Sequence, residues 1–117
     1  MSLGEALYEA CRLVRDGGTL DASSLAREVA ERHQAMSARL QELPDGLVRL
    51  RELADIAFDD YSEAVTMLRV ACDEETPELA QWAMERSLSG RDTMRRLRQL
   101  LEEYSQALCE EADDGDF

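Results

Sequence analysis

The chain has 117 residues, of which 44% are hydrophobic and only 5% aromatic, so one folded domain with a mainly aliphatic core is expected. Its formal net charge of −13 argues against binding to nucleic acid or to an anionic membrane surface, because both are negatively charged themselves. The negative charge fits a basic partner or simply keeps the chain in solution.

Two helices are predicted before the first proline. The first spans residues 2–16 and ends at a pair of adjacent glycines, which are poor helix formers. The second follows Asp21 or Ser23, either of which can accept a hydrogen bond from a free backbone N–H. It runs to residue 43, because the residue that precedes a proline avoids helical angles.

The most regular pattern in the chain lies in residues 47–73. Apolar side chains recur there in alternating steps of three and four through four heptads, so they form one stripe on a helix. A wide apolar arc of this kind predicts neighbouring helices on at least two sides. The stripe consists of Leu47, Leu50, Ala54, Ala57, Tyr61, Ala64, Leu68 and Ala71.

A fourth helix is predicted over residues 77–111. Thr76 can cap its start, and Pro77 stands where a missing N–H is tolerated. The apolar stripe of this helix contains only small residues before Gly90, so the helix either approaches a neighbour closely there or breaks. We predict a continuous helix, because one glycine costs only about 1 kcal/mol. Its second half has a stripe of Met94, Leu97, Leu101, Tyr104 and Leu108.

These elements predict an all-α protein. We expect an antiparallel four-helix bundle over residues 1–110, with the third and fourth helices as a long hairpin, and an acidic disordered tail over residues 111–117. Because the fourth helix is much longer than the first, part of the hairpin should lack a neighbour within the chain. Homodimerisation or a protein partner would cover the apolar stripe that remains.

Enzymatic activity, a cofactor and a bound metal are not expected. His33 is the only histidine, and its spacing to nearby acids does not match a carboxylate-bridged metal site. Two interpretations of His33 stay open, a half-solvated boundary residue or a ligand and proton-active group. Three widely spaced cysteines, Cys11, Cys72 and Cys109, are expected to be reduced thiols in the cytoplasm. Acidic residues interrupt the region where a signal peptide would be, and no stretch reaches transmembrane length.

Three arginines on the fourth predicted helix are candidate contact residues for a partner. Their i, i+4, i+7 spacing places them on one face, where they can bind an acidic peptide or a nucleic-acid backbone. Alternatively, they pair with acids of the third helix such as Glu52, Asp55, Asp59 and Glu63. The three arginines are Arg91, Arg95 and Arg98.

Three apolar residues of the fourth predicted helix complete the candidate interface. Trp82 either covers one end of the core or is an exposed anchor for a partner, since tryptophan is enriched at binding hot spots. Leu97 and Leu101 lie on the apolar stripe, and a charge at either position should disrupt association.

The sequence therefore predicts a non-enzymatic protein–protein interaction module, such as an adaptor, a chaperone-like protein or a scaffold, that acts through helix–helix association. Two alternatives stay open. One is an acidic inhibitor or immunity-type protein that blocks a basic target, whose binding would weaken steeply with salt. The other is a ligand- or metal-binding bundle centred on His33.

Overall fold

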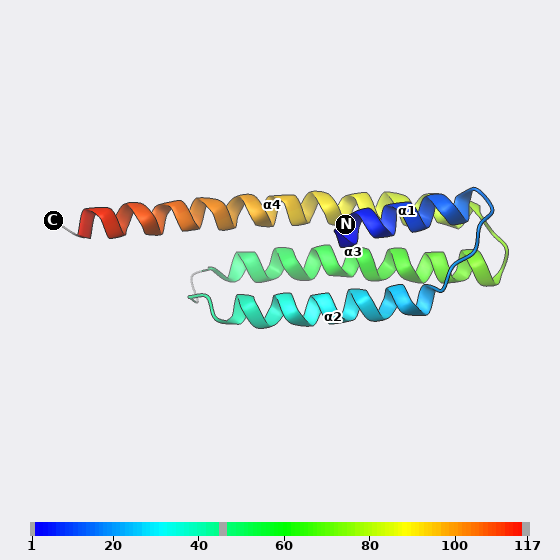
Figure 1. Ribbon diagram of the computed structural model, residues 1–117, viewed down its shortest axis with the longest axis horizontal. Helices are drawn as coiled ribbons and strands as arrows, with labels where there is room; N and C mark the ends of the chain where they lie inside the picture. The colour runs from blue at the N-terminus through cyan, green and yellow to red at the C-terminus, as the bar shows by residue number, and fades with distance from the viewer. Residues whose placement is uncertain (1, 45–46, 116–117) are drawn as a thin grey trace.

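The computed structural model describes residues 2–44 and 47–115. For residues 108–115 it describes the backbone alone. The described residues form four helices and no strand. The helices are α1 (Leu3–Arg15), α2 (Ala22–Gln41), α3 (Val48–Asp73) and α4 (Glu78–Gly115). Figure 1 shows that successive helices run in opposite directions within a rod of 65 × 20 × 20 Å. The predicted all-α antiparallel bundle is confirmed.

The turn after α1 explains why a pair of glycines follows this helix. Gly17 has a φ of 95°, in the left-handed region that a residue without Cβ adopts easily. The Gly17 N–H donates to the Val14 carbonyl, and the Gly18 N–H donates to the Leu13 carbonyl at 2.8 Å. These two bonds satisfy carbonyls that the end of a helix leaves free.

The start of α2 identifies which of the two predicted caps is used. Asp21 Oδ1 accepts a hydrogen bond of 3.0 Å from the Ser23 backbone N–H, so Asp21 is the cap. At its other end, α2 stops at Gln41, two residues before the predicted end at 43.

The connection between α3 and α4 differs from the prediction at Thr76. Glu75 has a φ of 52°, and the Thr76 N–H donates to the Ala71 carbonyl, which ends α3. Thr76 Oγ1 is buried and has no hydrogen-bond partner among the described residues, so the predicted side-chain cap is absent. Instead, the Thr76 carbonyl accepts a bond from the Leu79 N–H at 3.1 Å.

Helix α3 is the centre of the bundle and contacts each of the other three helices. Its predicted apolar stripe is buried from Leu50 to Ala71, and only the first member, Leu47, is half-buried. Helix α4 packs along one side of α3, and α2 packs along another. Helices α1 and α2 pack mainly against this α3–α4 hairpin rather than against each other.

Helix α4 is continuous through Gly90, as predicted, and approaches α3 closely there. A Cβ atom added at Gly90 would lie 2.6 Å from Tyr61 Cε1 and 3.1 Å from the Ala57 carbonyl oxygen. Other small residues before Gly90, among them Ala83 and Ser87, are also fully buried. The small side chains before Gly90 therefore allow α4 to pack closely against α3, and the helix does not break there.

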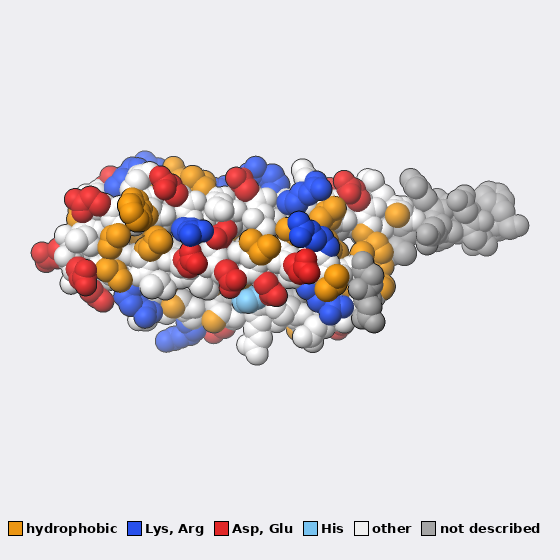
Figure 2. All heavy atoms as spheres, turned by 180° about the vertical axis from the view of Figure 1, so that it is seen from behind, with side chains coloured by type: hydrophobic (Ala, Val, Ile, Leu, Met, Phe, Trp, Pro, Cys, Tyr) orange, Lys and Arg blue, Asp and Glu red, His pale blue; other side chains and the backbone are white. Residues whose placement is uncertain are grey.

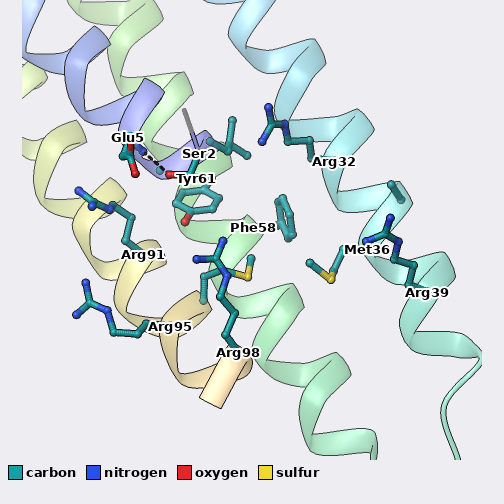
Figure 3. Close-up of a pocket in the computed structure, with 14 residues that line it drawn as sticks. Ser2, Glu5, Arg32, Met36, Arg39, Phe58, Tyr61, Arg91, Arg95 and Arg98 are labelled. Carbon is teal, nitrogen blue, oxygen red and sulfur yellow. Dashed lines mark hydrogen bonds between the residues drawn. The ribbon is translucent and has the colours of Figure 1, made fainter. Parts of the chain in front are cut away.

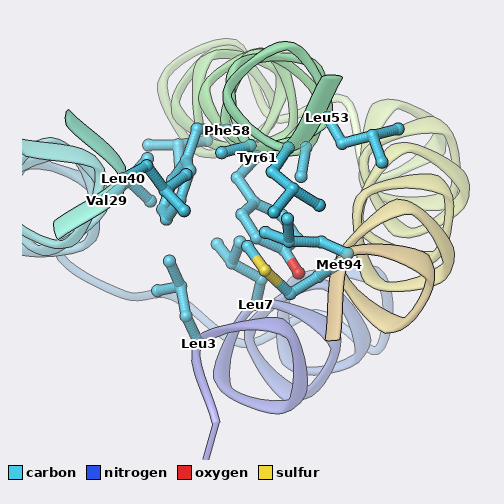
Figure 4. Packing of buried hydrophobic residues seen from close by; sticks show 13 residues of the cluster. Leu3, Leu7, Val29, Leu40, Leu53, Phe58, Tyr61 and Met94 are labelled. Carbon is cyan, nitrogen blue, oxygen red and sulfur yellow. The ribbon is translucent and has the colours of Figure 1, made fainter. Parts of the chain in front are cut away.

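The buried side chains form two cores along the rod. The alanine-rich core lies toward the α3–α4 turn, and the aromatic core lies toward the other end, where Figure 4 shows side chains from all four helices meeting. The alanine-rich core consists of Cys11, Val14, Ala64, Leu68, Ala71, Ala80, Ala83 and Met84. The aromatic core consists of Leu3, Leu7, Val29, Leu40, Leu50, Leu53, Ala54, Ala57, Phe58, Tyr61, Val65, Met94 and Leu97.

The helices differ greatly in length, and this difference shapes the molecule. Helix α1 has 13 residues and α4 has 38, so α1 covers the hairpin only toward the α3–α4 turn (Figure 1). Beyond the start of α1, only α2, α3 and α4 remain side by side. Part of the hairpin therefore lacks α1 as a neighbour, as the length difference predicts.

Of the predicted disordered tail over 111–117, the backbone of 111–115 belongs to α4, whereas the side chains of these residues and all of 116–117 lie outside the described residues. Among the described residues, no helix combines the length and the apolar character that crossing a membrane requires.

Candidate functional site

A cleft of about 510 Å³ opens where α1 begins. The first turn of α1 forms one end, α2 and α4 form the two sides, and α3 forms the floor (Figure 3). The cleft exists because the fourth corner of the bundle, which α1 fills toward the α3–α4 turn, has no helix beyond Leu3. Its location thus follows directly from the shortness of α1.

Arginines dominate the polar lining of this cleft. Five of them surround it, whereas Glu5 is the only acidic residue in the lining. In a chain with a net charge of −13, this is a local reversal of sign. By contrast, the face in Figure 2 mixes acidic and basic side chains, with acids gathered along its middle. The five are Arg32 and Arg39 from α2 and Arg91, Arg95 and Arg98 from α4.

Most of these arginines form no ion pair, or only an exposed one along their own helix, with the residues that the structure describes. Arg32 pairs with Glu28 at 2.8 Å and Arg95 with Asp92 at 3.5 Å, both along the same helix and both well exposed. The other three, Arg39, Arg91 and Arg98, form no ion pair with any described residue. The cleft therefore keeps guanidinium groups available for an anionic ligand.

The structure tests one of the two interpretations of the three α4 arginines, their pairing with acids of α3. All three line the same cleft, and none pairs with an acid of α3. It is Arg86, one turn earlier on α4, that bridges to α3, where its Nε lies 3.0 Å from Glu63 and its Nη1 lies 3.3 Å from Asp60. The predicted pairing of Arg91, Arg95 and Arg98 with α3 acids is therefore wrong.

The floor of the cleft is apolar and aromatic. Phe58 and Tyr61 from α3 meet edge to face, with ring centroids 5.8 Å apart. Met36 from α2 and Met94 from α4 complete the floor. A cationic rim above an apolar floor suits a ligand that carries both carboxylates and hydrophobic groups.

Tyr61 combines burial with an unpaired polar atom. Only 3% of the residue is exposed, yet its hydroxyl forms no hydrogen bond with any described residue. In Figure 3 this hydroxyl points toward the side of the cleft where Arg91 and Arg98 lie. Burial raises the pKa of Tyr61 while the charges of Arg98 and Arg91 act to lower it, so the hydroxyl keeps its proton at neutral pH and can donate a hydrogen bond.

Gly4 allows α1 to begin this close to the cleft. A Cβ atom at this position would collide with the side chain of Arg91 and lie 3.2 Å from Tyr61 Oη. The missing side chain thus lets the Arg91 stem and the Tyr61 ring pack against the first turn of α1.

His33 lies at a boundary between α2 and α3. Its Nε2 is 2.9 Å from Asp55 Oδ1, and its ring stacks on Phe58 with centroids 4.7 Å apart. Its side chain is 34% exposed. Within the described part of the chain, no group of three or more His, Cys, Asp or Glu side chains is placed to hold a metal ion. The geometry therefore matches the half-solvated boundary interpretation.

The three apolar candidates differ in their burial. Trp82 is 62% exposed, so it is not the core-covering residue that one interpretation required. Leu97 is fully buried in the aromatic core, so it is not available to a partner in the folded chain. Leu101 is half-buried at the edge of that core.

Cys11 is buried in the alanine-rich core, and burial raises its pKa from 9.0 to about 12. Its thiol is therefore protonated and a poor nucleophile at neutral pH. Cys72 is free and half-buried, and the side chain of Cys109 lies outside the description.

Some cleft residues escaped the sequence analysis. Arg32, Met36 and Arg39 follow i, i+4, i+7 spacing on α2, the same signal that identified the three arginines on α4. Tyr61 could have been noticed as the one hydroxyl in an otherwise apolar stripe. The sequence pattern does not show that these faces of α2 and α4 meet across α3.

Comparison with protein-family models, with curated proteins and with solved structures gives no match for this chain.

Proposed function

We propose that this chain is a non-enzymatic protein-interaction module and that its arginine-lined cleft binds an acidic segment of a protein partner. The observation that carries the proposal is the set of five arginines around an apolar floor, three of them without an ion pair. A partner segment with acidic and apolar side chains would satisfy both parts of this lining. Binding would desolvate the aromatic floor and pair the guanidinium groups.

The shape of the cleft favours helix–helix association as the mode of binding. The cleft occupies the corner of the bundle that α1 fills toward the α3–α4 turn, so a partner helix there would continue the four-helix arrangement. Recognition of an amphipathic helix by an apolar groove is a common mode of peptide binding. The free thiols of Cys11 and Cys72 support a place for this interaction in the cytoplasm.

A site-specific crosslinking experiment tests this proposal. A photo-crosslinking amino acid in place of Arg95, at the rim of the cleft, should capture a discrete protein in the native host. The same amino acid in place of Arg69, an exposed α3 residue outside the cleft lining, should not. The crosslink at position 95 should also disappear when Arg39→Glu is added.

A matched variant separates the cleft from general electrostatics. Arg96→Glu changes the net charge as much as Arg39→Glu does, but Arg96 is exposed and outside the cleft lining, so the crosslink should persist. Equal crosslinking at positions 69 and 95, or equal loss with both charge reversals, would contradict the proposal. A basic partner that ignores both variants would instead support the acidic-inhibitor alternative.

A further inference from the structure

We propose that the cleft of one copy binds residues 110–117 of a second copy, so that the chain forms an antiparallel dimer through the C-terminal halves of two α4 helices. In this arrangement a carboxylate of the segment accepts a hydrogen bond from the Tyr61 hydroxyl and pairs with Arg91, Arg95 and Arg98. This inference rests on the proposed function, because it names the acidic segment that the cleft binds.

The inner end of the cleft is built for an oxyanion. Only 3% of Tyr61 is exposed, and its hydroxyl, which faces the cleft, forms no hydrogen bond with any described residue. Arg91 and Arg98 line the same side and lack ion pairs. A carboxylate oxygen can accept hydrogen bonds from a hydroxyl and from guanidinium groups together, and such charge-assisted bonds are the strong ones. A carboxylate in the cleft would therefore bond to this hydroxyl and to the two guanidinium groups together.

Residues 110–117 have the chemistry that the cleft requires. The segment holds five acids and no base, and its last residue is Phe117, which suits the aromatic floor. No other stretch of eight residues in the chain has as many acids without a base. The acids are Glu110, Glu111, Asp113, Asp114 and Asp116.

The segment must come from another copy. Helix α4 is continuous from the cleft to Gly115, and Figure 1 shows it leading away from the bundle. Twelve residues separate Arg98 from Glu110, which is about 18 Å along a helix. A segment held at that distance by its own helix cannot fold back into its own cleft unless α4 unwinds. A second copy can present the same segment without any unwinding.

Two-fold symmetry makes the contact reciprocal. If Arg98 of one copy lies opposite Glu110 of the other, the two α4 helices run antiparallel and the symmetry axis lies near Tyr104, midway between them. Each copy then supplies one cleft and one acidic segment, which is the isologous arrangement of most dimers. The half-buried Leu101 and Tyr104 lie near this axis, so the dimer would also cover the apolar stripe of α4.

The net charge of −13 on each copy does not prevent this pairing. At physiological ionic strength, charges on the exposed surface are screened beyond about 8 Å, whereas contacting charges in a partly buried cleft are screened much less. Opposite charges that touch therefore outweigh like charges that are far apart. Raising the salt concentration about tenfold should weaken the dimer by about tenfold or more, because the contacting pairs are also attenuated.

A charge-swap experiment tests the inference in the full-length chain. One variant carries Arg95→Glu and Arg98→Glu in the cleft, and the other carries Glu110→Arg and Asp113→Arg in the segment. Each variant alone should be monomeric, because the facing positions 95 and 98 of the cleft and 110 and 113 of the segment then carry like charges. Their equimolar mixture should form a heterodimer, because both reciprocal contacts become attractive again. Light scattering coupled to size-exclusion chromatography measures the molar mass of each sample.

Controls separate this dimer from other associations. Arg96→Glu should leave the wild-type dimer intact, because Arg96 does not line the cleft. Tyr61→Phe should raise the dimer dissociation constant about tenfold, since a hydrogen bond to a charged group is lost. Tyr8→Phe, a matched removal of one hydroxyl outside the cleft lining, should leave it unchanged. Circular dichroism shows whether each variant keeps its helices.

A wild-type chain that stays monomeric at high micromolar concentration would overturn the inference, and so would a dimer that both charge-reversed variants retain. Failure of the mixture to restore the dimer would overturn it as well. None of these results affects the proposed function, which fails only if the crosslinker at position 95 captures no protein in a cleft-dependent way.

Discussion

The alanine-rich core and the aromatic core share the same long stripe of α3, yet only the second opens into a cleft. In the alanine-rich core, α1 covers the α3–α4 hairpin, and mostly small side chains from α1, α3 and α4 pack together. In the aromatic core, α1 is just beginning, and larger side chains such as Phe58 and Tyr61 remain at the floor of an open corner. The comparison shows that helix length, rather than a change in the α3 pattern, decides which half can accept a partner.

The largest expected effect distinguishes a buried from a half-buried position on α4. Leu97→Glu should lower the free energy of unfolding by more than about 4 kcal/mol, because the carboxylate would be buried without a partner. Leu101→Glu should cost less than about 1 kcal/mol, since that side chain reaches the edge of the core. Urea unfolding followed by circular dichroism measures both. Similar losses in the two variants would show that the open half is packed as fully as the closed half.

Truncation of one side chain in each half should give the next largest difference. Leu68 is fully buried in the alanine-rich core, so Leu68→Ala should cost about 3 kcal/mol through lost burial and a cavity. Met36 is half-buried at the floor of the cleft, so Met36→Ala should cost about 1 kcal/mol or less. Equilibrium unfolding in urea provides both values, and the reverse order would contradict the division into closed and open halves.

Alkaline pH should destabilise the fold through a buried acid in each half. Cys11 has a folded pKa of about 12 against 9.0 when solvated, and the pKa of Tyr61 is raised by burial from its ordinary value of 10.0. The unfolded chain loses these protons first, so their stabilising effect is complete below pH 9 and is lost as the pH rises toward 12.

The contribution of Cys11 should lower the free energy of unfolding by at most about 1.4 kcal/mol for each pH unit. Unfolding free energies from urea titrations between pH 8 and pH 11 should therefore fall, and Cys11→Ala should flatten the curve. The remaining slope should decrease further in Tyr61→Phe. A flat profile in the wild-type chain would show that neither group changes its environment on unfolding.

At the junction of the two halves, Gly90→Ala should destabilise the chain by about 1–2 kcal/mol, although alanine is the better helix former. The reason is the contact of the added Cβ with the Tyr61 ring and the Ala57 carbonyl. Ser89→Ala, at the exposed neighbouring position, is the control and should be neutral or slightly stabilising. Melting temperatures suffice for this comparison, and a stabilised Gly90→Ala variant would mean that α3 and α4 can separate there without loss.

The smallest effect is expected at the turn that closes the alanine-rich end. Glu75 adopts a left-handed conformation that is unfavourable for a side chain with Cβ. Glu75→Gly should therefore stabilise the chain by about 1 kcal/mol, seen as a higher melting temperature. The matched change Glu74→Gly should not stabilise it, because Glu74 has a φ of −103°. A gain from both variants would point to charge removal rather than backbone strain.

The sequence by itself determined the helices, the buried stripe of α3 and the continuity of α4 through Gly90. These follow from local periodicity, from glycine and proline positions and from side-chain size, all of which a single chain displays without its neighbours. The length difference between the first and fourth helices also predicted that part of the hairpin would lack a neighbour.

Only the tertiary structure decided which residues are available for binding. It exposed Trp82, buried Leu97, and left Arg91 and Arg98 unpaired while Arg86 took the α3 acids. It also brought the arginines of α2 and α4 to one cleft above Tyr61. The physical reason is that exposure and pairing depend on which helices meet and at what level along the rod. Sequence periodicity identifies the face of each helix but carries no information about the height at which α1 begins against α4.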